Sequence, residues 1–302
     1  MKYVIILFCL FSGLSGYASE PDSMKVERWL REASSLPKDS CRTLHFAKKM
    51  LGTPYVAGTL DVNNEETLVV HLDKVDCTTL VETVLALAIA DQQGKQNFEA
   101  FKEALMLVRY RDGHLAGYSS RLHYFSDWIK NNEAKGLVRE CTSDTKISLS
   151  SKLSLNFMST HSDSYLPMKK DTSLISQVAL FEKAWQGVEV RFIPKEKLNQ
   201  SPNELKIKNG DILFIVFAAE FEIVKDIHIL CPILIDGSGK RENCGIYKLQ
   251  FLLEHICAKL SYSLSVKQPT SFSSMFKKIS KASISGLNNS SILFISTYPL
   301  FF

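Results

Sequence analysis

Apolar residues in the first third of the chain, and again near residue 180, recur at intervals of three and four. This spacing gathers them on one face of an α-helix. Helices are therefore predicted at Asp22–Ala33, Ser40–Leu51, Thr78–Ile89, Phe98–Val108 and Leu174–Trp185. Pro37 separates the first two, as proline commonly does between helices.

Patterns typical of strands dominate the later part of the chain. A turn followed by a strongly apolar strand is predicted in "IKNGDILFIVF" (207–217), and "DIHILCPILID" (226–236) is expected to lie beside it. Further strands are predicted in "VEVRFIPKEKL" (188–198), before it turns, and at "ETLVVHLDKV" (66–75). Helices that come first and strands that come later indicate an α+β domain, with helices packed against an antiparallel sheet.

The two ends of the chain differ in composition from its middle. Residues 1–18 combine Lys2, a mostly apolar stretch and small residues before the expected cleavage point, as in a signal peptide for export. A periplasmic or secreted protein is therefore expected, with one domain over 19–260. Residues 261–302 form a Ser- and Lys-rich tail to which no structure is assigned. The apolar stretch at either end is too short to span a bilayer.

Charge and cysteine spacing exclude several classes of partner. The 302 residues carry a formal net charge of +4 with scattered lysines, so the chain lacks the concentrated basic face of a nucleic-acid binder. This modest positive charge favours an anionic partner such as a cell-wall polymer. Cys231, Cys244 and Cys257 are separated by gaps wider than those of zinc ligands, and no His-Glu-x-x-His helix is present. Neither a metal nor a cofactor is expected.

The stretch "VDCTTLVETVLALAIA" (75–90) places one cysteine at the start of a predicted helix. Asp76 is expected to cap this helix, so that Cys77 lies in the first turn. Free backbone N–H groups and the helix dipole stabilise a thiolate there, and the thiolate is the nucleophilic form of cysteine. A buried cysteine that acts as a small apolar side chain is the alternative, and helix position alone does not exclude it.

Three motifs together resemble the NlpC-type cysteine peptidase superfamily, which cuts bacterial cell-wall peptides: "LGTPYVAGT" (51–59), "DCTTLVE" (76–82) and "NGDILFIV" (209–216) followed by a histidine. The insertion between Gly58 and Asp76 and the stretch "SSRLHYFSDWI" (119–129) are similar to its N-acetylmuramoyl-L-alanine amidase-like branch. The resemblance implies a papain-like α+β fold with the nucleophile at a helix N-terminus.

The resemblance also implies a role for individual residues. Cys77 matches the nucleophile of the family, Tyr55 the tyrosine of its G-x-P-Y loop, and His228 the histidine on the strand after the Gly-Asp turn. His228 would then act as the general base that takes the thiol proton and later protonates the leaving amine. The alternative for His228 is an ordinary strand histidine.

The sequence after His228 departs from the pattern of the family. The family typically continues with a glycine, a short turn and a second polar residue that orients the imidazole, and "HILCPILIDGSGKREN" (228–243) has neither feature. Asp236, Glu242 and Asn243 are the polar candidates nearby, and no motif selects among them. The residue that orients His228 therefore stays open.

An aromatic and charged block lies in the middle of the chain. A substrate groove could be lined by Arg121, His123, Tyr124, Asp127 and Trp128, and Tyr55 is a further candidate for substrate binding. In this interpretation Arg121 pairs with a substrate carboxylate, and the aromatic rings cover peptide or sugar surface. A purely structural cluster is an equally good interpretation of the same residues.

These expectations together describe an exported cysteine hydrolase that cleaves an amide bond in peptidoglycan or muropeptides. The resemblance leaves two bonds open: the amide between N-acetylmuramic acid and L-alanine, and an amide within the stem peptide. Two other functions are carried forward, a non-catalytic peptidoglycan-binding protein and a thiol-dependent acyl or peptidyl transferase. The sequence does not indicate an oligomeric state.

Overall fold

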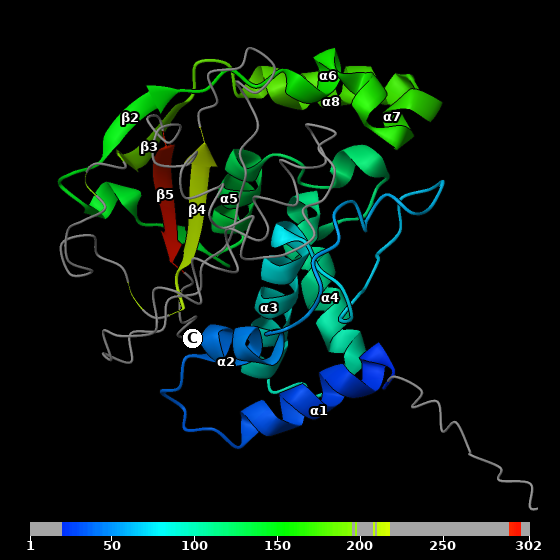
Figure 1. The fold of residues 1–302 in the computed structure, drawn as a ribbon, viewed down its shortest axis with the longest axis vertical. Coiled ribbons are helices and arrows are strands. Elements are labelled where there is room, and N and C mark those ends of the chain that lie inside the picture. The colour runs from blue at the N-terminus through cyan, green and yellow to red at the C-terminus, as the bar shows by residue number, and fades with distance from the viewer. Residues whose placement is uncertain (1–19, 195–196, 198–207, 209, 218–289, 297–302) are drawn as a thin grey trace, which may run out of the picture.

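Helices occupy one part of the molecule and an antiparallel sheet the other (Figure 1). The computed structural model describes residues 20–194, 197, 208, 210–217 and 290–296. Its α-helices are α1 (Asp22–Ser34), α2 (Arg42–Lys49), α3 (Cys77–Gln92), α4 (Phe98–Arg109), α5 (Phe125–Ala134), α6 (Phe157–Thr160), α7 (Leu166–Lys170) and α8 (Ser173–Ala184). Single 3-10 turns lie at Arg111–Gly113, Tyr118–Ser120, Thr142–Asp144 and Ser162–Ser164.

Five antiparallel strands form the described sheet: β1 (Arg139–Glu140), β2 (Leu149–Lys152), β3 (Glu189–Pro194), β4 (Ile212–Phe217) and β5 (Ser290–Ser296). Strand β5 pairs with β4 along its length, from Ile212 opposite Ile295 to Phe217 opposite Ser290. It also pairs with β1 and β3, and β3 continues to β2. The sheet therefore joins strands that are far apart in the sequence.

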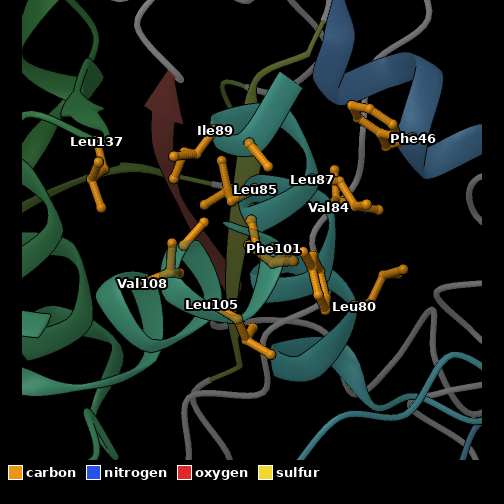
Figure 2. Close-up of a cluster of buried hydrophobic side chains, with 14 of the residues drawn as sticks. Phe46, Leu80, Val84, Leu85, Leu87, Ile89, Phe101, Leu105, Val108 and Leu137 are labelled. Carbon is orange, nitrogen blue, oxygen red and sulfur yellow. The ribbon is translucent and has the colours of Figure 1, made fainter. Parts of the chain in front are cut away.

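Helix α3 is the centre of the hydrophobic core (Figure 2). Twelve of its 16 residues are buried, so the helix is enclosed on nearly all sides rather than on one face. Phe46 of α2 and Phe101 of α4 belong to the same buried cluster, as does Phe214 of β4. Full burial of each such side chain contributes about 1.5–3 kcal/mol, so α3 is firmly held in place.

Most of the predicted elements are confirmed. Helices α1, α2, α3, α4 and α8 and strands β3 and β4 all fall within or beside the predicted segments. The α+β class with an antiparallel sheet is confirmed as well. The predicted strand at 226–236 lies outside the described residues, and the partner that the structure gives β4 is β5. Residues 290–296, in the segment to which no structure was assigned, thus form a strand.

The prediction of a strand at residues 66–75 was wrong. The segment is irregular, with a bend at Leu72 and Asp73, and within it only Val75 makes a β-bridge, to Tyr55. Its polar backbone groups are satisfied by side chains instead: Arg109 donates to the Val69 carbonyl at 2.6 Å, and the Leu72 N–H donates to Asp22 at 3.2 Å. The apolar residues of the segment pack on the helical core. Its apolar pattern is therefore explained by burial and does not require pairing in a sheet.

In the part of the chain that the structure describes, no helix combines the length and the apolar character that crossing a membrane requires.

Gly210 illustrates how closely the turn before β4 packs on α2. Its φ is +86°, and a Cβ at this position would overlap the Sγ of Cys41. We expect Gly210→Ala to lower the free energy of unfolding by about 2–4 kcal/mol, because left-handed strain and overpacking act together. Gly94→Ala is the matched control, since its φ is +69° with no heavy atom within 4 Å. Equal losses for both variants in urea unfolding would contradict this packing.

Candidate active site

Cys77 is the first residue of α3, and its side chain is buried, at 5% exposure. Asp76 caps the helix: its carboxylate accepts from the Thr79 N–H at 2.8 Å, and the Thr79 hydroxyl accepts from the Asp76 N–H at 2.8 Å. This reciprocal arrangement is a capping box, and it confirms the predicted cap. The thiol therefore lies in the first turn, where the helix dipole favours the thiolate.

The loop that carries Tyr55 lies beside the residues that precede Cys77. Val56 N–H donates to the Val75 carbonyl at 2.9 Å, and Val75 N–H donates to the Pro54 carbonyl at 3.0 Å. Tyr55 and Val75 thus form a short parallel bridge. Two predicted site segments are brought together by these backbone bonds. His228, the predicted base, lies outside the described residues.

A buried ion pair joins α3 to α4 one and a half turns beyond Cys77. Glu82 accepts from the Nε of Arg109 at 2.6 Å, and both side chains are 2% exposed. Arg109 also holds the segment before Cys77 through the Val69 carbonyl. Burial raises the pKa of Glu82, and the charge of Arg109 counteracts this shift. Glu82 therefore anchors the fold around the start of α3.

Arg121 is engaged by two carboxylates of the chain itself. Its guanidinium forms an ion pair with Asp61 and lies 3.6 Å from Glu66, and it is stacked over the Tyr118 ring at 4.9 Å. The Tyr110 hydroxyl donates to Glu66 at 2.8 Å. These contacts fasten residues 59–75, hereafter the insertion, to the segment after α4. A substrate carboxylate would have to compete with Asp61 and Glu66 for Arg121.

His123 is held as a neutral side chain. Its Nε2 lies 2.8 Å from the Tyr118 carbonyl, and its ring packs on Tyr118 at a centroid distance of 4.4 Å. Burial, assisted by the charge of Arg121, lowers the pKa of His123 to about 3. At neutral pH this imidazole is uncharged and donates to the carbonyl, so it holds Tyr118 in position.

Tyr124 and Trp128 connect elements of the fold. The Tyr124 hydroxyl donates to Glu182 at 2.6 Å and accepts from the Met158 N–H at 2.9 Å, which links α5 to α6 and α8. Trp128 is 2% exposed and packs on Phe214 of β4 at a centroid distance of 6.0 Å. Such contacts favour the alternative interpretation of these residues, a purely structural cluster. Trp128 belongs to the hydrophobic core.

A pocket of about 430 Å³ lies where the insertion faces two later segments. The sequence interpretation missed it, although the insertion itself was recognised. Charged, amide and apolar side chains line it: Leu60, Asp61, Asn63, Asn64, Glu65, Glu66, Tyr118, Pro167, Lys170, Asp171 and Leu174, with Gly117. Arg121 fixes one wall, because it holds Asp61 and Glu66 and covers Tyr118.

The motifs located so far fall within one continuous match. The family model described as AmiA-like, N-acetylmuramoyl-L-alanine amidase-like, matches residues 45–224, which include the Tyr55 loop, Cys77 and β4. The chain belongs to the N-acetylmuramoyl-L-alanine amidase-like family. The resemblance inferred from the three motifs is thereby confirmed.

Solved structures agree with the assignment to the amidase-like family. A Bacteroides fragilis protein provisionally named a xylanase is 33% identical, with a TM-score of 0.58 over 83% of this chain and 99% of its own. An N-acetylmuramoyl-L-alanine amidase from Bacteroides uniformis is 28% identical, with a TM-score of 0.60 over 85% of this chain and 97% of its own.

A more distant structure extends the likeness of the fold alone. A Legionella pneumophila protein of the family DUF1460 is 18% identical, with a TM-score of 0.58 over 92% of this chain and 94% of its own. No curated protein matches the chain significantly.

The cap of α3 offers a test of how the candidate nucleophile Cys77 depends on the start of this helix. Asp76→Ala removes the side-chain acceptor for Thr79, and we expect a loss of about 1 kcal/mol in stability together with a fall in thiol reactivity. Asn97→Ala is the matched control, because Asn97 caps α4 by accepting from the Ala100 N–H at 2.8 Å.

Thermal unfolding and alkylation of Cys77 by iodoacetamide as a function of pH measure the two effects. The control should lose similar stability while the reactivity of Cys77 is unchanged. An unchanged pH profile in Asp76→Ala would show that the cap does not influence the thiol.

Proposed function

We propose that the chain is an exported cysteine hydrolase that cleaves an amide bond of peptidoglycan or of its muropeptide fragments. The observation that carries the proposal is the position of Cys77, at the capped N-terminus of a buried helix and inside the amidase-like match. Similarity to an N-acetylmuramoyl-L-alanine amidase supports the substrate class. A papain-like arrangement of the nucleophile helix against the sheet is part of the same proposal.

The proposed reaction has two stages. His228 accepts the thiol proton of Cys77, and the thiolate attacks the amide carbonyl carbon to form a tetrahedral oxyanion. The C–N bond then breaks, His228 gives the proton to the leaving nitrogen, and an acyl thioester on Cys77 is left. Water, deprotonated by His228, attacks the thioester and releases a carboxylic acid and the thiol. The N–H groups at the start of α3 favour the anionic sulfur.

Two amide bonds are candidates for cleavage. Cleavage between N-acetylmuramic acid and L-alanine is favoured, because the Bacteroides uniformis neighbour is named for that activity. Incubation of the purified protein with defined muropeptides, followed by mass spectrometry, distinguishes the two. An amidase releases an intact stem peptide with a free L-alanine amine, whereas an endopeptidase leaves a shortened peptide on the sugar.

Two other functions predict different products. A peptidoglycan-binding protein would bind sacculi and release nothing, a function motivated by the departure from the family pattern after His228. A transferase using the same thioester would give products that carry a new acyl acceptor. A substrate whose mass is unchanged, or a product that carries an added acceptor, would therefore reject hydrolysis.

Export is the remaining part of the proposal. The composition of residues 1–18 supports it, since a positive residue, an apolar stretch and small residues follow in the order of a signal peptide. Expression of the full chain, followed by N-terminal sequencing of the periplasmic or secreted protein, tests it. A mature N-terminus near Ser19 is expected, and retention of the uncleaved chain in the cytoplasm would contradict export.

A further inference from the structure

The pocket beside the insertion has an unbalanced charge. Four carboxylates line it, those of Asp61, Glu65, Glu66 and Asp171, against the one ammonium of Lys170. The single guanidinium of Arg121 forms ion pairs with both Asp61 and Glu66. Among the described residues, no ion pair is formed by Glu65 or Asp171. These two carboxylates are therefore the uncompensated charges of the pocket.

Both of these carboxylates are available to a ligand. Glu65 and Asp171 are exposed, Glu65 in the insertion and Asp171 directly after α7. Hydrogen bonds from Ser173 lower the pKa of Asp171, so this carboxylate is charged at neutral pH. The Lys170 ammonium is engaged by Asn64 at 2.8 Å, a contact that also connects the insertion to α7. The pocket thus favours a positive charge over an anion.

The residue types of the lining favour an organic cation over a metal ion. In the described parts of the chain, no three His, Cys, Asp or Glu side chains are grouped closely enough to hold a metal. Leu60, Tyr118 and Leu174 line the same pocket and add apolar surface to the carboxylates. A lining that combines exposed carboxylates with apolar surface fits an alkyl chain that ends in an ammonium group.

We propose that this pocket binds the side-chain ammonium group of a diamino acid in the stem peptide of the substrate. The proposal rests on the function proposed above, because peptidoglycan stem peptides supply such a residue. Glu65 and Asp171 would pair with the ammonium, and the apolar lining would cover the methylene groups that carry it. Recognition of the stem peptide would thus occur at the insertion.

The test compares two muropeptides that differ only at this amine, which is charged in one and neutral in the other. Both contain lysine as the third residue of the stem peptide, with the ε-amine free in one and acetylated in the other. Calorimetry with the Cys77→Ala variant, which leaves the ligand uncleaved, should show about three- to tenfold tighter binding of the free amine. Steady-state kinetics of the wild type should show the same preference in KM, with kcat little changed.

The double variant Glu65→Gln, Asp171→Asn should abolish the preference for the free amine, so that the two muropeptides bind with about equal affinity. Its matched control is Glu99→Gln, Glu103→Gln, which removes two exposed carboxylates of α4 that pair with Lys102 and Lys95. The control variant has the same net charge as the pocket variant, and it should keep the preference for the free amine. Equal affinity for the two muropeptides, or a preference that persists in the pocket variant, would overturn the proposal. A preference without any turnover supports the pocket and contradicts the hydrolase.

Discussion

Replacement of Cys77 by alanine is expected to lower the turnover of muropeptides by about a thousandfold or more. Alanine has no nucleophile, so the thioester cannot form, whereas the N-terminal turn of α3 and its Asp76 cap remain. The release of peptide from a defined muropeptide, followed by mass spectrometry, measures the effect. Because the change removes one sulfur, the thermal midpoint should fall by only a few degrees.

Cys141→Ala provides the comparison, since Cys141 is also buried, at 6% exposure, and lies outside the first turn of any α-helix. We expect this variant to retain turnover within about twofold. Activity that survives in Cys77→Ala would rule out the thiol mechanism. Equal losses in both variants would attribute the effect to general destabilisation.

The largest expected effect on stability comes from the buried pair of Glu82 and Arg109. Arg109→Met leaves the Glu82 carboxylate buried without its partner and the Val69 carbonyl without its donor. We expect the free energy of unfolding to fall by about 3–5 kcal/mol. Equilibrium unfolding in urea measures this change.

Two further variants separate the charge from the packing. Glu82→Leu combined with Arg109→Met replaces the pair by apolar side chains and should recover most of the lost stability. Arg28→Met removes a partly exposed arginine that pairs with Glu20 and Glu32, and it should cost less than about 1 kcal/mol. Equal losses in the free energy of unfolding for Arg28→Met and Arg109→Met would contradict the argument that Arg109→Met leaves Glu82 as a buried charge without a partner.

Local patterns predicted five of the eight described α-helices, missed α5, α6 and α7, and failed where distant side chains decide the structure. Cys77 was expected in the first turn of a helix because Asp76 is a good cap and the apolar residues that follow have a helical period, and both features are present. The irregular segment 66–75 has the apolar content of a strand. Its carbonyl and N–H groups are bonded by Arg109 and Asp22, and no local pattern indicates those contacts.

The same limit applies to the candidate site. The aromatic and charged residues around Arg121 were recognised, and either a groove or a structural cluster was compatible with their composition. Arg121 pairs with Asp61 across 60 residues, and Tyr124 bonds Glu182 across 58. Ion pairs and hydrogen bonds at such separations depend on the fold as a whole, as does the pocket that the insertion forms with α7. The contact between His228 and Cys77 stays a prediction.

The position of β5 has a consequence for how the protein is made. Strands β1, β3 and β4 all pair with residues 290–296, so the described sheet cannot close until the ribosome has released this segment. At typical translation speeds, roughly 4–16 s separate the synthesis of β4 from that of β5. During this interval the helices can pack, but β4 has no partner in β5. A nascent chain with an incomplete sheet is still open to chaperones and, under the export proposed above, to the export machinery.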